Sequence, residues 1–438
     1  MSQTSPKGKA SSHTSGLVEY SPNGIVFPGI MVLTSKNGLW KLLFWAWIIC
    51  LIPRVAVFSL FGEFSNSNNV FLDASNCGYQ YPLYNSLSFL LWTVSYNQPL
   101  IYIGLFLLIQ SLVGPLVLLL CRLFNFPSTA SWLSVFGVAF LPYYVSVAAR
   151  QPQVGFTIVM FCAWLVSFVA WIKNGFNQRL GFLFSLMSFS LLLLRPNAIS
   201  SIVVLYLYIL GRTFIGSSKG KTLKAWEDVT RVFTSIACFA LLCSILVLLN
   251  FFSHGHPSLF TPNSGYNLYI GNNAWVSEYV KRYDILSLED IVRDHGLPPE
   301  ALAETNLYKR DNILKKIALE YATTNPVLTL KNSVLKYLRY WDFRMEDYEM
   351  NHLFWNLAYT IPYITMMIFA AAGIVFAFKQ GQHSQLTILI LVLASYSLPH
   401  AFFFGMIRMR MVTEFLLIML AAYGMNSLTG KMTKTLVK

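Results

Sequence analysis

Residues 232–252, VFTSIACFALLCSILVLLNFF, contain no charged side chain in 21 consecutive positions. A helix needs about 20 mainly apolar residues to cross the roughly 30 Å hydrocarbon core of a bilayer. The whole chain is 55% hydrophobic and only 12% charged, whereas a soluble domain carries about 25% charged residues. The sequence therefore predicts an integral membrane protein.

Nine further apolar segments have a similar character. With the first, the candidate spans are 39–61, 99–121, 129–148, 153–172, 180–195, 197–211, 232–252, 354–378, 385–403 and 411–427. The pair at 180–211 is short, but basic residues flank both of its ends, so we expect two crossings with an outer turn at Arg195-Pro196-Asn197. We predict an all-α polytopic membrane protein with about ten transmembrane helices.

The positive charge of the chain follows this topology. Cytoplasmic loops of membrane proteins are enriched in Lys and Arg. With a cytoplasmic N-terminus, the tails and inner loops carry sixteen Lys and Arg but only three acids, Glu19, Glu227 and Asp228. Those segments alone account for the net charge of +13, so no nucleic-acid partner is needed to explain it.

The segments divide the chain into four parts. They are a disordered cytoplasmic tail (1–38), an N-terminal transmembrane module with a first outer loop at 62–98 (39–252), an extracytoplasmic loop region (253–353), and C-terminal transmembrane helices with a cytoplasmic tail (354–438). In the first outer loop, the apolar run 83–94 is too short to cross and predicts a helix in the membrane interface. The large loop begins with Gly, Pro and Asn, which favour irregular structure, and then shows helical spacing from 286 to about 344.

Five arginines depart from the positive-inside pattern. They lie at the predicted outer ends of spans and are Arg54, Arg150, Arg195, Arg408 and Arg410. A charge at membrane depth is costly and is a functional candidate, and the planar guanidinium suits phosphate. The alternative is that each snorkels to lipid headgroups. His400 lies close in sequence to the last pair and is a phosphate ligand or a buried structural residue.

Acids are scarce on the same predicted face. Outside the large loop they are Glu63, Asp73 and Glu414, and a carboxylate beside a phosphate site can act as a general base on a hydroxyl. The alternative for the two first-loop acids is ordinary solvation. His254 and His256 form a weak metal candidate because no third ligand is spaced with them, so we assign no cofactor and leave a divalent metal open.

Five stretches resemble one family in their order along the chain. They are GYQYPLYNSLSFLL (78–91), LLLLRPNA (191–198), GYNLYIGNNAW (265–275), ATTNPVLTLKNSVLKYLRYW (322–341) and HAFFFGMIRMRMVTEFLLIMLAAYG (400–424). Together they are similar to GT-C-type glycosyltransferases, polytopic enzymes that take sugars from polyprenyl-phosphate donors on the extracytoplasmic side. Protein mannosyltransferases and aminoarabinose transferases belong to this class.

The resemblance implies roles for particular residues. Arg54, Arg195, His400, Arg408 and Arg410 would bind the donor phosphate, and Tyr84, Asn267, Tyr269 and Asn272 would line the acceptor side or the loop that covers the site. The family has an Asp directly after the first span. Here that spacing falls on Glu63, while the nearest aspartate is Asp73. The last span also has Met and Val where the family often has Leu-Pro.

The function expected from this resemblance is transfer of a sugar from a polyprenyl-phosphate-linked donor to a lipid, glycan or protein acceptor. The enzyme would be a multi-pass protein of a bacterial inner or plasma membrane, with both termini cytoplasmic. Three alternatives remain: a flippase or transporter of lipid-linked sugars, an O-antigen polymerase or ligase, and a non-catalytic relative. The transporter alternative needs polar groups at mid-membrane depth, and the predicted spans contain few.

Overall fold

The computed structural model describes residues 36–61, 82–96, 98–142, 144–145, 152–217, 222–260, 262–281, 290–343, 353–403 and 407–436. Within these ranges the chain is helical and contains no strand. The N-terminal helices are α2 (Lys36–Phe61), α4 (Pro82–Val94), α5 (Pro99–Gln110), α6 (Val113–Leu123), α7 (Ser128–Phe140), α9 (Pro152–Lys173), α10 (Gln178–Leu194), α11 (Ile199–Ser217) and α12 (Thr222–His254). They are followed by α13 (Ser264–Gly271), α14 (Val276–Lys281), α15 (Asp290–His295), α16 (Pro299–Leu302), α17 (Leu307–Thr324), α18 (Pro326–Tyr340), α19 (Leu353–Lys379), α20 (His383–Ser397), α21 (Pro399–Phe402) and α22 (Ile407–Leu436).

Eight helical segments of the described chain are long and apolar enough to cross a membrane. They are Gly38–Val57, Leu100–Leu123, Gln153–Lys173, Pro196–Ile215, Trp226–Ser253, Leu357–Lys379, His383–Phe402 and Met409–Gly430. Each coincides with one of the predicted spans, so the prediction of a helical membrane protein is confirmed. The other two predicted spans, 129–148 and 180–195, correspond to the shorter helices α7 and α10. At 1.5 Å per residue these helices are about 20 and 26 Å long.

The predicted span at 99–121 forms two helices, α5 and α6, with a break at Ser111 and Leu112. Pro115 explains the break, because it has no N–H to donate to the carbonyl of Ser111 one turn earlier. The amide of Gly114 donates to that carbonyl instead, over 3.2 Å. The two helices still form one apolar segment of 24 residues.

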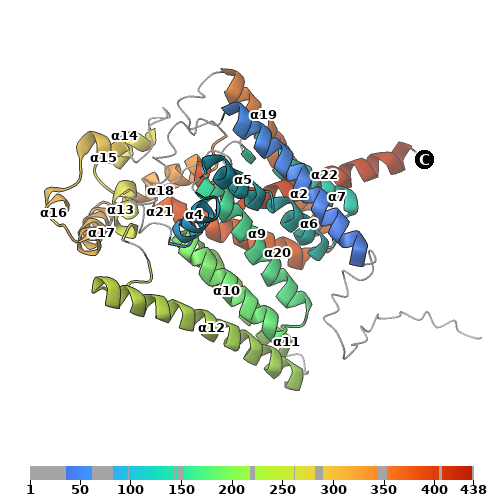
Figure 1. Cartoon of the computed structure of the whole chain (residues 1–438), viewed down its shortest axis with the longest axis horizontal. Coiled ribbons are helices and arrows are strands. Elements are labelled where there is room, and N and C mark those ends of the chain that lie inside the picture. The colour runs from blue at the N-terminus through green and yellow to red at the C-terminus, as the bar shows by residue number, and fades with distance from the viewer. Residues whose placement is uncertain are drawn as a thin grey trace, which may run out of the picture.

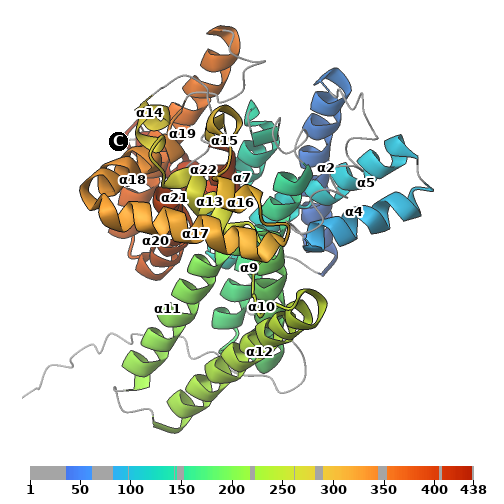
Figure 2. The ribbon, with the colours of Figure 1, turned by 90° about the vertical axis from the view of Figure 1, so that its left-hand side faces the viewer.

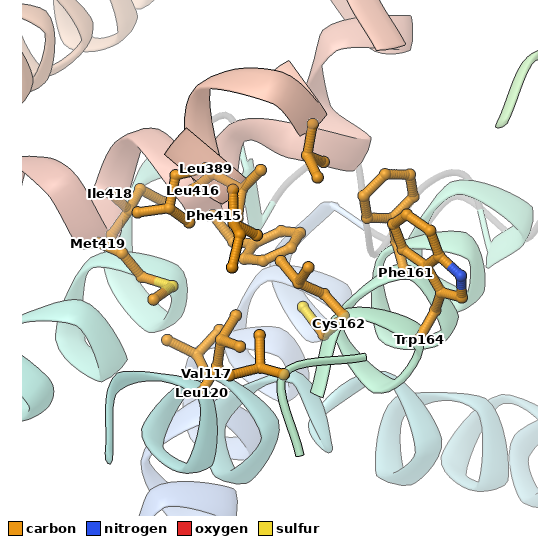
Figure 3. Packing of buried hydrophobic residues seen from close by; sticks show 14 of the residues in the cluster. Val117, Leu120, Phe161, Cys162, Trp164, Leu389, Phe415, Leu416, Ile418 and Met419 are labelled. Atoms are coloured by element: carbon orange, nitrogen blue, oxygen red, sulfur yellow. The ribbon is translucent and has the colours of Figure 1, made fainter. Parts of the chain in front are cut away.

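Helices α9 and α22 form the centre of the bundle. In the apolar segment of each of these two helices, 78% of the residues are buried against the rest of the protein, compared with 11% for α12. Aromatic and aliphatic side chains fill the space between them, as Figure 3 shows for Phe161 and Trp164 of α9 and Phe415 of α22. The exposed apolar face of α12 is what a helix surrounded by lipid requires.

Glycines allow close contact between α19 and α22. A Cβ on Gly373 would overlap the carbonyl oxygen of Leu420, and a Cβ on Gly424 would overlap that of Phe369. Small residues are common at helix contacts in membranes because they let two backbones approach.

The helices α13 to α18 gather at one end of the bundle, and α22 runs to the opposite end, where the C-terminus is marked (Figure 1). Figure 2 shows α17 lying across the front of this group. The predicted irregular start of the large loop instead contains the helix α13. Asp311 on α17 accounts for the difference, because its carboxylate accepts hydrogen bonds from the Tyr266 amide (3.0 Å) and the Ser264 hydroxyl (3.2 Å) at the start of α13. A carboxylate at this position satisfies an unpaired amide and favours the helix dipole.

Candidate functional site

The entry to the last span is held by side chains from the α13–α18 group. Lys336 on α18 is fully buried, and its Nζ donates to the carbonyl oxygens of Gly271 (2.8 Å), Phe402 (3.1 Å) and Phe403 (3.2 Å). Burial lowers the pKa of Lys336 to about 7, while three carbonyl acceptors favour its charged form. The side-chain amide of Asn272 also donates to the Phe402 carbonyl, over 2.7 Å. These bonds tie α13 and α18 to the junction of α21 and α22.

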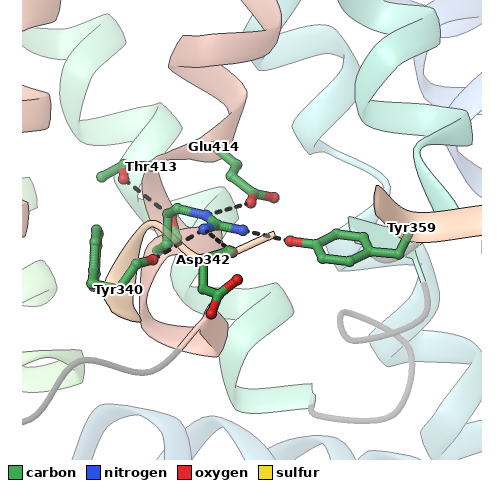
Figure 4. Close-up of polar contacts among 6 residues, drawn as sticks. Tyr340, Asp342, Tyr359, Thr413 and Glu414 are labelled. Atoms are coloured by element: carbon green, nitrogen blue, oxygen red, sulfur yellow. Dashed lines mark hydrogen bonds and ion pairs between the residues drawn. The ribbon is translucent and has the colours of Figure 1, made fainter. Parts of the chain in front are cut away.

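Arg410 joins three helices at this junction. Its Nε donates to Glu414 Oε1 (2.8 Å), and its Nη1 donates to the carbonyl oxygens of Tyr340 (3.0 Å) and Asp342 (2.8 Å) at the end of α18. Its Nη2 donates to the hydroxyl of Tyr359 on α19. Figure 4 shows these partners surrounding the guanidinium. Four of the five N–H groups of Arg410 are therefore used inside the protein.

Glu414 balances Arg410 but is only half satisfied. The side chain is fully buried, and Oε2 accepts no hydrogen bond from the described residues. Tyr144, also fully buried, lies within electrostatic range of both Glu414 and Arg54. The Tyr144 hydroxyl has no hydrogen-bond partner in the described chain either.

Arg54 lies on α2, on the Tyr144 side of this cluster. It is buried, and its guanidinium donates to the carbonyl oxygens of Cys50 (2.9 Å) and Val138 (3.4 Å). The second bond reaches α7. The Nε of Arg54 meets no acceptor among the residues that the structure describes. Arg54 is thus a buried charge without a carboxylate bonded to it in the described chain, and not a side chain extended into solvent.

Arg195 and His400 complete the group. Arg195 ends α10 in an extended conformation, followed by the short 3-10 helix Pro196–Ala198, so the predicted Arg-Pro turn is present. Its Nη1 lies 3.7 Å from the sulfur of Met409, the residue before Arg410. The ring of His400 stacks on Tyr340, with centroids 5.0 Å apart, and the carbonyl of Tyr340 accepts a hydrogen bond from Arg410. The fold therefore brings predicted donor-site residues from distant segments to one junction.

The remaining predicted residues are described in part or not at all. Glu63, Asp73 and Arg150 lie outside the described residues. Helices α4, α12 and α22 include Tyr84, His254 and Arg408 respectively, but their side-chain positions are not described.

Three of the four predicted acceptor or loop residues belong to α13 and its end. Tyr269 is buried beside Leu314 and Ala318 of α17, and this burial raises the pKa of its hydroxyl. Asn272 is buried and holds the junction, as described above. Asn267 is half-buried on α13. In this structure, Tyr269 and Asn272 fix the position of α13.

For a metal, the described residues offer no group of three His, Cys, Asp or Glu side chains. The ring of His256 stacks on Tyr308, with centroids 5.4 Å apart. The described part of the chain thus gives the His254–His256 pair no third ligand.

Sequence reasoning missed Lys336 and Asp311. Each lies on a helix with several charged residues, for which the sequence predicts exposure to solvent. No local pattern marks either residue as buried. The sequence analysis places Glu414 among the scarce acids, and the spacing of four residues on one helix accounts for its pairing with Arg410.

Buried charged side chains gather near this junction. In this part of the described chain they are the guanidinium groups of Arg54, Arg195 and Arg410 and the carboxylate of Glu414. Asp342 adds a second carboxylate at a partly exposed edge. No family model matches the chain, and no curated protein is significantly similar to it, so its function is inferred from these residues.

Proposed function

We propose that the protein is a membrane glycosyltransferase that transfers a sugar from a polyprenyl-phosphate-linked donor to an acceptor on the extracytoplasmic face. The observation that supports this proposal is that the buried guanidinium of Arg195 lies against Met409, next to the buried Arg410 at the start of α22. Arginine binds phosphate through parallel hydrogen bonds. A phosphate that leaves with negative charge is stabilised by positive groups already in place.

The roles divide according to how each side chain is held. Arg195, together with Arg408, would contact the donor phosphate. Arg410 uses four of its N–H groups on protein partners, so it would contribute mainly its charge and the position of α22. Glu63 or Asp73 would remove the proton from the acceptor hydroxyl. The covering helices α13 to α18 would select the acceptor.

The proposal includes a topology of ten crossings with both termini in the cytoplasm, in which α7 and α10 belong to the two additional crossings. Cysteine accessibility tests it. A cysteine at Glu320, exposed on α17, should react only from outside the cell, and one at Ser384, exposed at the start of α20, only from the cytoplasm. Reaction of both from one side would contradict this topology.

Activity is tested with purified protein in liposomes, supplied with a labelled polyprenyl-phosphate sugar and an envelope extract as acceptor. The expected result is a labelled product together with released polyprenyl phosphate. Movement of the intact donor across the bilayer, without cleavage, would instead support the flippase alternative. Mass spectrometry of envelope glycans with and without the gene would then identify the sugar that is lost.

A matched pair of variants on α10 tests the phosphate role. Arg195→Ala should lower kcat/KM for the donor. The loss should correspond to about 1.5–3 kcal/mol of transition-state stabilisation, the range for hydrogen bonds to charged groups. Arg179→Ala, exposed at the other end of the same helix, should leave kcat/KM unchanged. Equal activity of both variants would remove Arg195 from the donor site.

A further inference from the structure

Helix α18 is amphipathic in the opposite sense from a helix on a soluble protein. It buries the polar residues Asn332, Ser333 and Lys336, together with Tyr340. Its apolar residues point outward: Val327 is 82% exposed, Leu330 67%, Val334 53% and Leu338 61%. These four lie at intervals of three or four residues, so they form one stripe along the helix. We call them the α18 stripe.

The buried face of α18 is anchored at the ends of membrane spans. The Tyr337 hydroxyl lies 3.2 Å from Ser397 Oγ at the end of α20. Lys336 bonds the carbonyls of Phe402 and Phe403, and the Tyr340 carbonyl accepts from Arg410 near the start of α22. The helix is therefore fixed where the spans α20 and α22 reach the membrane surface.

A position at the membrane surface explains the inverted pattern. In water, four exposed aliphatic side chains in one stripe are unfavourable, whereas a helix lying in the interface places such a face against acyl chains. Lys331, exposed beside the stripe, has a flexible stem that can reach a lipid phosphate. The occupant that fits both the apolar stripe and this charge is a phospholipid leaflet.

We propose that α18 lies in the headgroup region of the leaflet that surrounds the end of α20 and the start of α22. The α18 stripe is turned toward the acyl chains of that leaflet. The buried face of α18 then holds the α21–α22 junction at the level of the lipid phosphates. This position follows from burial and contacts alone and does not depend on the proposed glycosyl transfer.

Lipid contact can be measured by fluorescence quenching in liposomes. The background carries Ser at Cys77, Cys238 and Cys243, since Cys50, Cys121 and Cys162 are buried. Cysteines introduced at Leu330 and Val334 receive an environment-sensitive fluorophore, and the bilayer contains phospholipid with a nitroxide high on the acyl chain. Lys316→Cys and Glu320→Cys, at exposed polar positions on the neighbouring α17, are the controls.

The expected result is quenching at 330 and 334 at least twice that at 316 and 320. Equal quenching at all four positions would overturn the proposal. A second outcome would also overturn the proposal. If positions 330 and 334 are protected from water but not quenched by the lipid, and this protection grows with protein density, then a second copy of the protein covers the stripe.

Hydroxyl-radical footprinting of the unlabelled protein in liposomes gives an independent measurement without any substitution. Leu330 and Leu338 should be modified at least threefold less than Leu319, which is 48% exposed on α17. Modification of all three in proportion to their exposure would place α18 in water and overturn the proposal.

Discussion

Arg410 and Glu414, one turn apart on α22, form an ion pair in which both side chains are fully buried, with 2.8 Å between Nε and Oε1. The pair lies inside the segment Met409–Gly430, where neither charge can turn to water. Its partners on α18 and α19 make it the point at which the covering helices meet the bundle.

Removal of one member should destabilise the protein strongly. Arg410→Ala or Glu414→Ala should each lower the free energy of unfolding by about 3–5 kcal/mol, because the remaining charge is left buried. The double variant Arg410→Ala/Glu414→Ala should lose less than the sum of the two. Unfolding in mixed micelles measures all three, and additive losses would contradict coupling between the two side chains.

Gly271 should not tolerate a side chain. A Cβ at this position would overlap the carbonyl oxygen of Phe403, so Gly271→Ala should separate α13 from the α21–α22 junction at a cost of about 1–3 kcal/mol. The control is Gly211→Ala on α11, where a Cβ would meet no atom within 4 Å. There the higher helix propensity of Ala should leave thermal stability equal or slightly raised. Equal thermal shifts would contradict the close contact at Gly271.

The stability contribution of Lys336 should depend on pH. Its pKa is about 7 in the folded protein and about 10.4 in an unfolded chain. Between these values the unfolded chain binds more protons, so unfolding free energy relative to Lys336→Met should rise with pH. The slope is at most about 1.4 kcal/mol per pH unit. Thermal unfolding of both proteins from pH 7 to 9.5 measures it. A difference independent of pH would mean that the three carbonyl acceptors keep Lys336 charged.

The first-loop carboxylates should differ in their effect on transfer. Glu63 follows the first span directly, and position limits what a carboxylate can reach more than one methylene does. We therefore expect Glu63→Gln to lose about 10²–10⁴-fold in rate, the usual effect of removing a general base. Asp73→Asn at matched expression should lose less. If only Asp73→Asn is inactive, the spacing argument is wrong. If both variants remain active, the proposed general-base mechanism is wrong.

The sequence alone determined the class of the protein and the positions of its eight long apolar segments in the described chain. Apolar runs such as 232–252 are local properties, and a bilayer imposes helix on any run of that length because unpaired backbone groups are too costly in lipid. The turn at Arg195-Pro196 was also predictable, since proline cannot continue the hydrogen bonding of the preceding helix.

Only the tertiary structure decided which distant side chains meet. Arg195 and Met409 are 214 residues apart in the chain, and no local pattern specifies that distance. Asp311 stabilises a helix in a segment whose Gly and Asn content favoured a loop. The residues of α18 alternate between polar and apolar as in any surface helix. Packing against α20–α22 determined that its polar face is buried and its apolar face exposed, because buried carbonyl groups at the span ends needed a donor.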